Sequence, residues 1–292
     1  ESMAAWFESV WGDRQQIQDI KKSFLDQLAW IGGDKAPDFI YYLILYHIFT
    51  DTIEELDEEK IIKTKTGIKE HLIWQKLYKF QKDGVLGAIQ KLEKYNGCII
   101  ADSVGLGKTF EALAIIKYYE LRNDKVLVLC PKRLRDNWTL YLQNDERNIF
   151  CDDRFRYDVL NHSDLSRSHG MSGDINLATL NWKNYDLVVI DESHNFRNNA
   201  PNKKKGLSRY RKLMRDIIKA GINTKVLMLS ATPVNSKMND LKNQVAFITE
   251  GDNSALADAG INSIENTLKK AQTCFNRWLD TDGRDSGILL ES

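Results

Sequence analysis

Residues 99–111 read Ile-Ile-Ala-Asp-Ser-Val-Gly-Leu-Gly-Lys-Thr-Phe-Glu, an apolar strand that runs into a glycine-rich turn and then into a helix. Backbone N–H groups of such a turn and the positive end of the helix converge on one place, where Lys108 adds a full charge. Gly105 and Gly107 allow positive φ angles and a close approach to phosphate, and Thr109 places a hydroxyl where Mg²⁺ sits between the terminal phosphates. The segment therefore predicts a nucleoside triphosphate site. Its expected contacts are Asp102, Ser103, Val104, Gly105, Leu106, Gly107, Lys108 and Thr109.

Charge balance, the length of the apolar runs and the spacing of the cysteines limit the partners and the cellular setting that we expect. The 292-residue chain carries 41 basic and 41 acidic residues, so any nucleic-acid contact must come from a local patch. Its longest apolar run, Phe39 to Phe49, is too short to span a bilayer, so we expect no membrane partner. The cysteines are widely spaced, which argues against structural zinc and a disulfide framework and favours a reducing, cytoplasmic setting. They are Cys98, Cys130, Cys151 and Cys274.

Apolar periodicity divides the chain into three regions. Residues 1–70 form an N-terminal helical region, in which Ile17, Ile20 and Phe24 begin a stripe at helical spacing. Residues 71–250 alternate helices with short apolar strands, the pattern of a parallel sheet that is buried on both faces. Residues 251–292 read as a helical tail. We therefore expect an α/β fold that binds its ligand at the carboxyl ends of the strands, with helical segments before and after it.

The expected elements of the central region follow from its apolar runs. The strands are predicted over residues 97–101, 125–130, 186–191 and 225–230, with a weaker one near 157–160. Crossover helices are predicted over residues 81–95, 108–121 and 208–220.

An acidic pair follows the apolar strand that ends at Ile190. Asp191 and Glu192 emerge at the strand tip, where the nucleotide would lie. Asp191, together with Thr109, is suited to hold Mg²⁺, and Glu192 to orient and deprotonate an attacking water. On this interpretation Glu192 and Lys108 are the catalytic residues, and ATP and Mg²⁺ are the cofactors.

Two further segments carry weaker signals. Ser230 and Thr232 follow the last strand and can hydrogen-bond the acidic segment near His194, which would couple nucleotide state to the rest of the lobe. A capped turn before a helix explains the same residues equally well. Gln81, beside Phe80, has an amide that can pair with N6 and N7 of adenine. A polar residue in the first turn of a helix is the alternative explanation.

In this order the segments resemble the first motor lobe of superfamily-two helicases, and most closely the Swi/Snf-type branch of DNA-dependent ATPases. That branch opens its phosphate loop with Asp, as Asp102 does here, and the segments 130–132, 137–138 and 196–198 also match it. The resemblance implies a RecA-like P-loop NTPase lobe over about residues 74–250. Ser103 and Ser193 depart from the family's pattern. Because neither change removes a phosphate or metal ligand, we expect little chemical consequence.

The resemblance also implies ATP hydrolysis coupled to movement along nucleic acid, usually duplex DNA. Family contacts to the nucleic-acid backbone map onto Lys132, Arg133 and Arg135, for which a solvated loop is an equally good explanation. The family motor has a second RecA-like lobe that supplies an arginine to the transition state, and nothing after Asn235 repeats the strand–helix pattern. The sequence therefore predicts a lobe that binds ATP weakly and barely hydrolyses it alone.

Other assignments stay open at this point. An RNA helicase of the Asp-Glu-Ala-His type shares several motifs, although Asp102 and residues 196–198 favour the duplex-DNA branch. A nucleotide-gated interaction module would use the same ATP site without movement. More loosely, the helical lead with Trp6 and Trp11 resembles bacterial multidomain helicases that carry a phospholipase-D-like domain upstream.

Overall fold

The computed structural model describes residues 67–196, 208–221, 223–233 and 238–280 of the chain. The chain divides into two units, Glu1–Glu55 and Leu56–Ser292, and every described residue belongs to the second. The helical region predicted for residues 1–70 therefore lies outside the described residues, apart from its last four, in which Ile68–Glu70 form a short 3₁₀ helix. The domain boundaries near residues 70 and 250 stay predictions.

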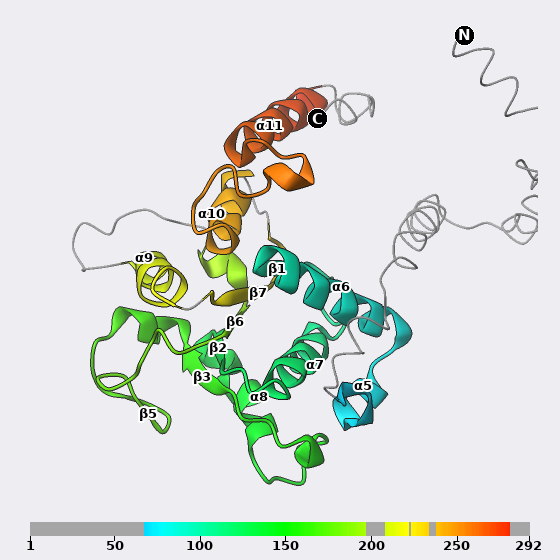
Figure 1. The fold of residues 1–292 in the computed structure, drawn as a ribbon, viewed down its shortest axis with the longest axis vertical. Coiled ribbons are helices and arrows are strands. Elements are labelled where there is room, and N and C mark those ends of the chain that lie inside the picture. The colour runs from blue at the N-terminus through cyan, green and yellow to red at the C-terminus, as the bar shows by residue number, and fades with distance from the viewer. Residues whose placement is uncertain (1–66, 197–207, 222, 234–237, 281–292) are drawn as a thin grey trace, which may run out of the picture. The chain divides into compact units, whose positions relative to one another are not determined.

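A five-stranded parallel sheet forms the centre of the described part (Figure 1). The order of its strands is β1-β7-β6-β2-β3, and every neighbouring pair is parallel. The five strands are β1 (Gly97–Ile100), β2 (Val126–Cys130), β3 (Asp158–Asn161), β6 (Leu187–Asp191) and β7 (Lys225–Leu229). The predicted α/β fold is confirmed, as is every predicted strand, including the weaker one.

Helices cover both faces of this sheet (Figure 1). One face packs against α6 (Lys79–Tyr95) and α7 (Lys108–Glu120), and the other against α9 (Arg209–Lys212) and α10 (Met238–Ile248). Along β6, Val189 belongs to the apolar cluster on the first face and Val188 to the cluster on the second. Burial on both faces explains why the central strands β2, β6 and β7 read as continuous apolar runs.

Apart from α11, the remaining helices and strands are short. The helix predicted over 208–220 is present as α9 followed by a π-helical segment, Leu213–Ile218. The other helices are α5 (Leu72–Lys76), α8 (Arg135–Thr139) and α11 (Ile264–Asp280), and β4 (Met171–Ser172) and β5 (Ile175–Asn176) form an antiparallel hairpin. Further 3₁₀ helices span Lys132–Leu134, Leu140–Leu142, Cys151–Asp153, His162–Ser166, Ser193–Phe196 and Ala257–Ala259.

The strand order brings three loops to one edge of the sheet. β7 lies between β1 and β6, and the backbone N–H of Ser230 donates to the carbonyl of Ile100 at 3.1 Å. Asp191 at the end of β6 is in register with Leu229. The phosphate loop after β1, the acidic pair at the end of β6 and the segment after β7 are therefore neighbours in space.

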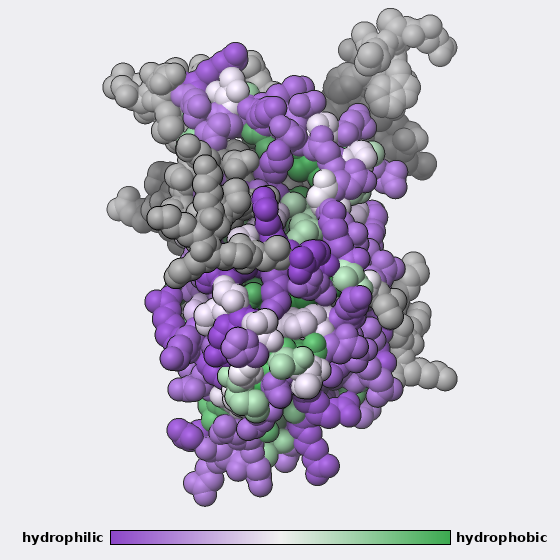
Figure 2. Space-filling view, turned by 90° about the vertical axis from the view of Figure 1, so that its left-hand side faces the viewer, coloured by the Kyte–Doolittle hydropathy of each residue, from purple (hydrophilic) through white to green (hydrophobic). Residues whose placement is uncertain are grey.

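One side of the described part can be seen in a space-filling view. On the side that carries α9 and β5, hydrophilic residues dominate and apolar ones are confined to small areas (Figure 2). Within the described residues, no helix is long and apolar enough to cross a membrane.

Candidate functional site

The phosphate loop occupies residues 101–107 between β1 and α7. Gly105 and Gly107 have φ angles of +89° and +85°, the left-handed conformation that the sequence analysis required of them. At Gly107 a side chain would be strained by the positive φ, and its Cβ atom, 2.5 Å from Nε2 of Gln81, would also displace the Gln81 amide from the loop. α7 begins at Lys108, so its amino-terminal N–H groups open directly onto the loop.

The Lys108 ammonium lies across this loop. Its Nζ atom donates to the carbonyl of Asp102 at 2.6 Å and to that of Ser103 at 3.1 Å. These two bonds hold the positive charge at the position where the turn gathers its backbone amides. A phosphate that binds here would accept hydrogen bonds from an ammonium group that the backbone already holds in position.

A buried carboxyl group lies beside the loop. Glu111 on α7 is 1% exposed, and its Oε2 atom has no hydrogen-bond partner among the described residues. Burial, and secondarily the charge of Asp102, raise the pKa of Glu111 above its ordinary value. Burial next to Asp102 thus favours the neutral form of the Glu111 carboxyl group. The sequence analysis did not single out this residue.

The acidic pair and the phosphate loop face one cleft of about 410 Å³. Lys108, Thr109, Asp191 and Glu192 all line it, as does Trp138 from α8. The two motifs that the sequence placed far apart along the chain therefore converge. Glu192 has a φ angle of +50°, a strained conformation for a residue with a side chain. Such strain is typical of functional sites.

Both oxygens of Asp191 accept hydrogen bonds. The indole Nε1 of Trp138 donates to Oδ2 at 3.0 Å, and the backbone N–H of Glu192 donates to Oδ1 at 2.9 Å. Burial raises the pKa of Asp191, while the hydrogen bond from Trp138 opposes this rise. Trp138 did not appear among the predicted site residues. Its signal was the Asn137-Trp138 match to the family motif, which gave no role to the side chain.

The residues predicted to couple nucleotide state are partly brought together. His194 Nδ1 lies 3.2 Å from Ser230 Oγ and 3.3 Å from Glu192 Oε2. Thr232 joins through its backbone N–H, which donates to Ser230 Oγ at 3.2 Å, whereas its side chain is exposed. The segment after β7 thus contacts the acidic pair through Ser230.

A second link between these segments was missed by the sequence analysis. Ser193 is fully buried, and its hydroxyl donates to Oε1 of Gln244 on α10 at 2.7 Å. Gln244, also fully buried, donates from Nε2 to the carbonyls of Pro233 and Asp240. One glutamine therefore ties the acidic segment to the segment after β7.

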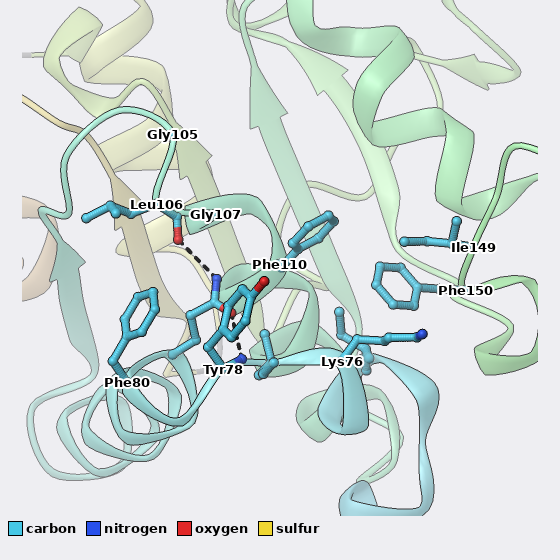
Figure 3. Close-up of a pocket in the computed structure, with 12 residues that line it drawn as sticks. Lys76, Tyr78, Phe80, Gly105, Leu106, Gly107, Phe110, Ile149 and Phe150 are labelled. Atoms are coloured by element: carbon cyan, nitrogen blue, oxygen red, sulfur yellow. Dashed lines mark hydrogen bonds between the residues drawn. The ribbon is translucent and has the colours of Figure 1, made fainter.

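Gln81 lies beside the loop, and its amide bonds to the backbone at two places. Its Oε1 accepts from the backbone N–H of Tyr78 at 3.0 Å, and its Nε2 donates to the carbonyl of Leu106 at 3.0 Å (Figure 3). The amide thereby fixes the start of α6 to the phosphate loop. Contact with adenine would use the second N–H and the remaining lone pair, and stays a prediction.

The cleft next to Gln81 has aromatic walls. It measures about 450 Å³ and is lined on one side by Tyr78 and Phe80 and on the other by Phe110 and Phe150 (Figure 3). Tyr78 and Phe80 are exposed, and their rings are stacked with centroids 6.2 Å apart. Flat, apolar walls beside a phosphate loop are suited to a nucleobase.

The basic residues predicted to contact nucleic acid lie near the cleft, on Lys132–Leu134 and α8. Lys132 and Arg133 are exposed. Arg135 is half-buried, and its guanidinium donates to Ser172 Oγ at 2.9 Å. Lys132 and Arg133 are therefore the two cations of this segment with exposed side chains, while part of the Arg135 fork is already engaged within the protein.

No group of three or more His, Cys, Asp or Glu side chains that could hold a metal ion occurs in the part of the chain that the structure describes. A nucleotide-bound Mg²⁺ does not require one, since phosphates and waters supply most of its ligands. The hydroxyl of Thr109 and the carboxylate of Asp191 in one cleft are hard oxygen donors of the kind that Mg²⁺ prefers.

A parallel sheet, a glycine-rich loop with Lys-Thr at the start of a helix, and an acidic pair two strands away in the same sheet define a P-loop NTPase lobe of the helicase type. Comparison with known families agrees. The chain belongs to the family described as type III restriction enzyme, res subunit, whose profile matches residues 75–235.

Curated relatives of the chain include proteins named as helicases. The chain is 32% identical over 168 residues to "Uncharacterized ATP-dependent helicase YqhH" of Bacillus subtilis, covering 55% of this chain and 28% of the relative. It is 28% identical over 189 residues to "DNA annealing helicase and endonuclease ZRANB3" of Mus musculus, covering 58% of this chain and 16% of the relative. The chain thus spans less than a third of the length of either relative.

A Swi/Snf-type protein is among the relatives as well. The "SWI/SNF-related matrix-associated actin-dependent regulator of chromatin subfamily A-like protein 1 homolog" of Caenorhabditis elegans is 28% identical over 180 residues, which cover 60% of this chain and 24% of the relative. The Swi/Snf-type resemblance is confirmed, and the RNA-helicase alternative gains no support.

Among solved structures, "Sulfolobus solfataricus SWI2/SNF2 ATPase core in complex with dsDNA" matches 62% of this chain and 38% of that chain, at 22% identity and a TM-score of 0.42. The phospholipase-D-like domain predicted upstream stays a prediction, because none of these matches bears on it.

Proposed function

We propose that this chain is the first motor lobe of a Swi/Snf-type, DNA-stimulated ATPase and translocase. The observation that carries the proposal is the single cleft lined by Lys108 and Thr109 of the phosphate loop and by Asp191 and Glu192 at the end of β6. A nucleotide gate without hydrolysis has no need of a second carboxylate next to Asp191, yet Glu192 also lines that cleft.

Each residue has a distinct task in this proposal. Lys108 and the loop amides bind the β- and γ-phosphates, and the aromatic cleft beside Gln81 takes adenine. Thr109 and Asp191 would hold Mg²⁺, which neutralises charge that develops on the transferred phosphoryl group. Glu192 accepts a proton from the attacking water as that water approaches the γ-phosphate in line with the departing oxygen.

The proposal includes a second lobe and a nucleic-acid partner. An arginine from that second lobe would supply about 10³–10⁵ in rate, which is roughly 4–7 kcal/mol of the barrier. Lys132 and Arg133 are exposed cations, and we propose that they contact the phosphodiester backbone of duplex DNA. The relatives' names support DNA rather than RNA as the partner.

Nucleotide binding and hydrolysis test the proposal separately. The 292-residue chain should bind a fluorescent ATP analogue in the presence of Mg²⁺ and hydrolyse ATP barely at all. The two-lobed protein should hydrolyse ATP faster when duplex DNA is added, and less so with an equal mass of RNA. Hydrolysis that does not respond to DNA would favour the gating module instead.

A further inference from the structure

The indole of Trp138 connects two parts of the site that the proposed function treats separately. Trp138 lies on α8, directly after the 3₁₀ helix Lys132–Leu134 that carries the exposed cations. Its side chain is 1% exposed, and its Nε1 donates to Asp191 Oδ2 at 3.0 Å. The same short segment therefore bears the proposed backbone contacts and a hydrogen bond to the proposed magnesium ligand.

Tyr157 also fixes the position of Trp138, in addition to the hydrogen bond with Asp191. The hydroxyl of Tyr157 donates to the carbonyl of Trp138 at 2.7 Å. The two rings also pack edge to face, with centroids 6.2 Å apart and planes at 85°. Because both the backbone and the ring of Trp138 are fixed in a buried setting, the indole N–H has one direction in which to donate.

Asp191 depends on this donor for its orientation. One carboxylate oxygen accepts from Trp138 and the other from the backbone of Glu192, so the carboxyl plane is set from both ends. Each oxygen keeps lone-pair capacity for a water of the magnesium shell. Loss of the indole bond would free Oδ2 and leave the plane defined by one contact alone.

We propose that Trp138 is a positioning residue which fixes the Asp191 carboxylate for magnesium and transmits to it the docking of a phosphodiester backbone on Lys132 and Arg133. The inference rests on the proposed function. A phosphodiester that binds the two cations displaces the start of α8, and the indole carries this displacement to Asp191. Coupling of this kind is reciprocal, so bound magnesium nucleotide also favours the backbone-binding arrangement.

Trp138→Phe tests the positioning role, because it keeps an aromatic ring and removes the N–H. Fluorescent ADP binding to the 292-residue chain is titrated with Mg²⁺. We expect the Mg²⁺ concentration at half-saturation to rise about 10-fold, as for other residues that orient a metal ligand. Binding without Mg²⁺ should stay at the wild-type level, which a general loss of structure would not leave intact. Trp182→Phe, a half-buried tryptophan away from the cleft, is the matched control.

A duplex oligonucleotide tests the transmission. Adding it to the wild-type chain should lower the Mg²⁺ concentration at half-saturation, and in Trp138→Phe this effect should disappear. An unchanged Mg²⁺ requirement in a folded Trp138→Phe protein would overturn the positioning role. A wild-type chain whose Mg²⁺ requirement ignores DNA would overturn the coupling.

A spectroscopic measurement on the wild-type chain avoids reliance on the variant's folding. The indole ¹H–¹⁵N resonance of Trp138 should shift when Mg²⁺ is added to the nucleotide complex, and again when duplex DNA is added. A resonance that stays fixed through both additions would refute the inference. Absence of any Mg²⁺-dependent nucleotide binding in the wild-type chain would instead refute the proposed function, so the two failures are distinguishable.

Discussion

Ser193→Ala removes one hydroxyl from the interior and leaves a polar partner behind. The Ser193 hydroxyl donates to Gln244 Oε1 at 2.7 Å, and both side chains are fully buried. Without the hydroxyl, that amide oxygen has lost its donor in a place that water does not reach. We expect a loss of about 1–3 kcal/mol in the free energy of unfolding, the cost of an unsatisfied buried polar group.

A double-mutant cycle with Gln244→Met isolates the pair. Gln244→Met also removes the bonds to the carbonyls of Pro233 and Asp240, so it should cost more than Ser193→Ala. Once Gln244 is gone, loss of the Ser193 hydroxyl has less effect. The double variant should therefore be more stable than the sum of the singles predicts, by about 1 kcal/mol.

Urea unfolding of the four proteins measures these differences, and thermal melting checks them at about 2–4 °C per kcal/mol for a domain of this size. Ser168→Ala is the control, because Ser168 is exposed and should change stability by no more than about 0.5 kcal/mol. Nucleotide affinity should hold in Ser193→Ala, since Ser193 does not line the cleft. If Ser193→Ala changes the free energy of unfolding no more than Ser168→Ala does, and the effects of Ser193→Ala and Gln244→Met simply add, the hydrogen bond between Ser193 and Gln244 does not stabilise the fold.

Three further predictions concern the loop, the acidic pair and a buried histidine. Lys108→Ala should weaken nucleotide binding about 10- to 100-fold, from the loss of charged hydrogen bonds worth about 1.5–3 kcal/mol; steady hydrolysis by the chain alone that Lys108→Ala abolishes would contradict the need for a second lobe. Glu192→Gln should keep nucleotide binding but end turnover in the two-lobed protein. Glu192→Gly should also end turnover, and it should raise the free energy of unfolding in urea by about 1 kcal/mol, since glycine tolerates positive φ. Normal turnover in either variant would show that Glu192 is not the base. Burial lowers the pKa of His162 to about 4. As the pH falls below about 6.5 the imidazole is therefore protonated in the unfolded chain before it is in the folded one, and the free energy of unfolding should decline by up to about 3 kcal/mol between pH 6.5 and 4. An NMR titration of this imidazole in the folded protein with a midpoint near 6.5 would refute the prediction.

The fold was accessible from the sequence because its signals are local. The central strands β2, β6 and β7 each contain a continuous apolar run, and each of the loops after β1, β6 and β7 carries its chemistry within a few residues of a strand end. The position of β7 between β1 and β6 is different in kind. It depends on which apolar runs pair, and no single segment encodes that choice.

Gln81 illustrates the same limit at the level of one side chain. The sequence predicted that its amide contacts adenine, but it could not indicate that both heteroatoms of that amide bond to the backbones of Tyr78 and Leu106. The pattern of residues around this amide indicates a base-binding group, but the amide also joins the start of α6 to the phosphate loop. The local pattern fixes where such a residue lies, and tertiary contacts decide how many of its hydrogen bonds remain for a ligand.

Three of the residues that the sequence analysis missed, Ser193, Gln244 and Trp138, share one property, which is that their partners are distant along the chain. Ser193 and Gln244 are 51 residues apart, and Trp138 and Asp191 are 53 apart. Ser193 nonetheless carried a usable signal. A hydroxyl that replaces alanine inside a motif directly after a buried strand needs an acceptor there, because an unpaired buried polar group is costly. The departure from the family pattern, expected to matter little, was thus itself a prediction of a polar partner elsewhere in the fold.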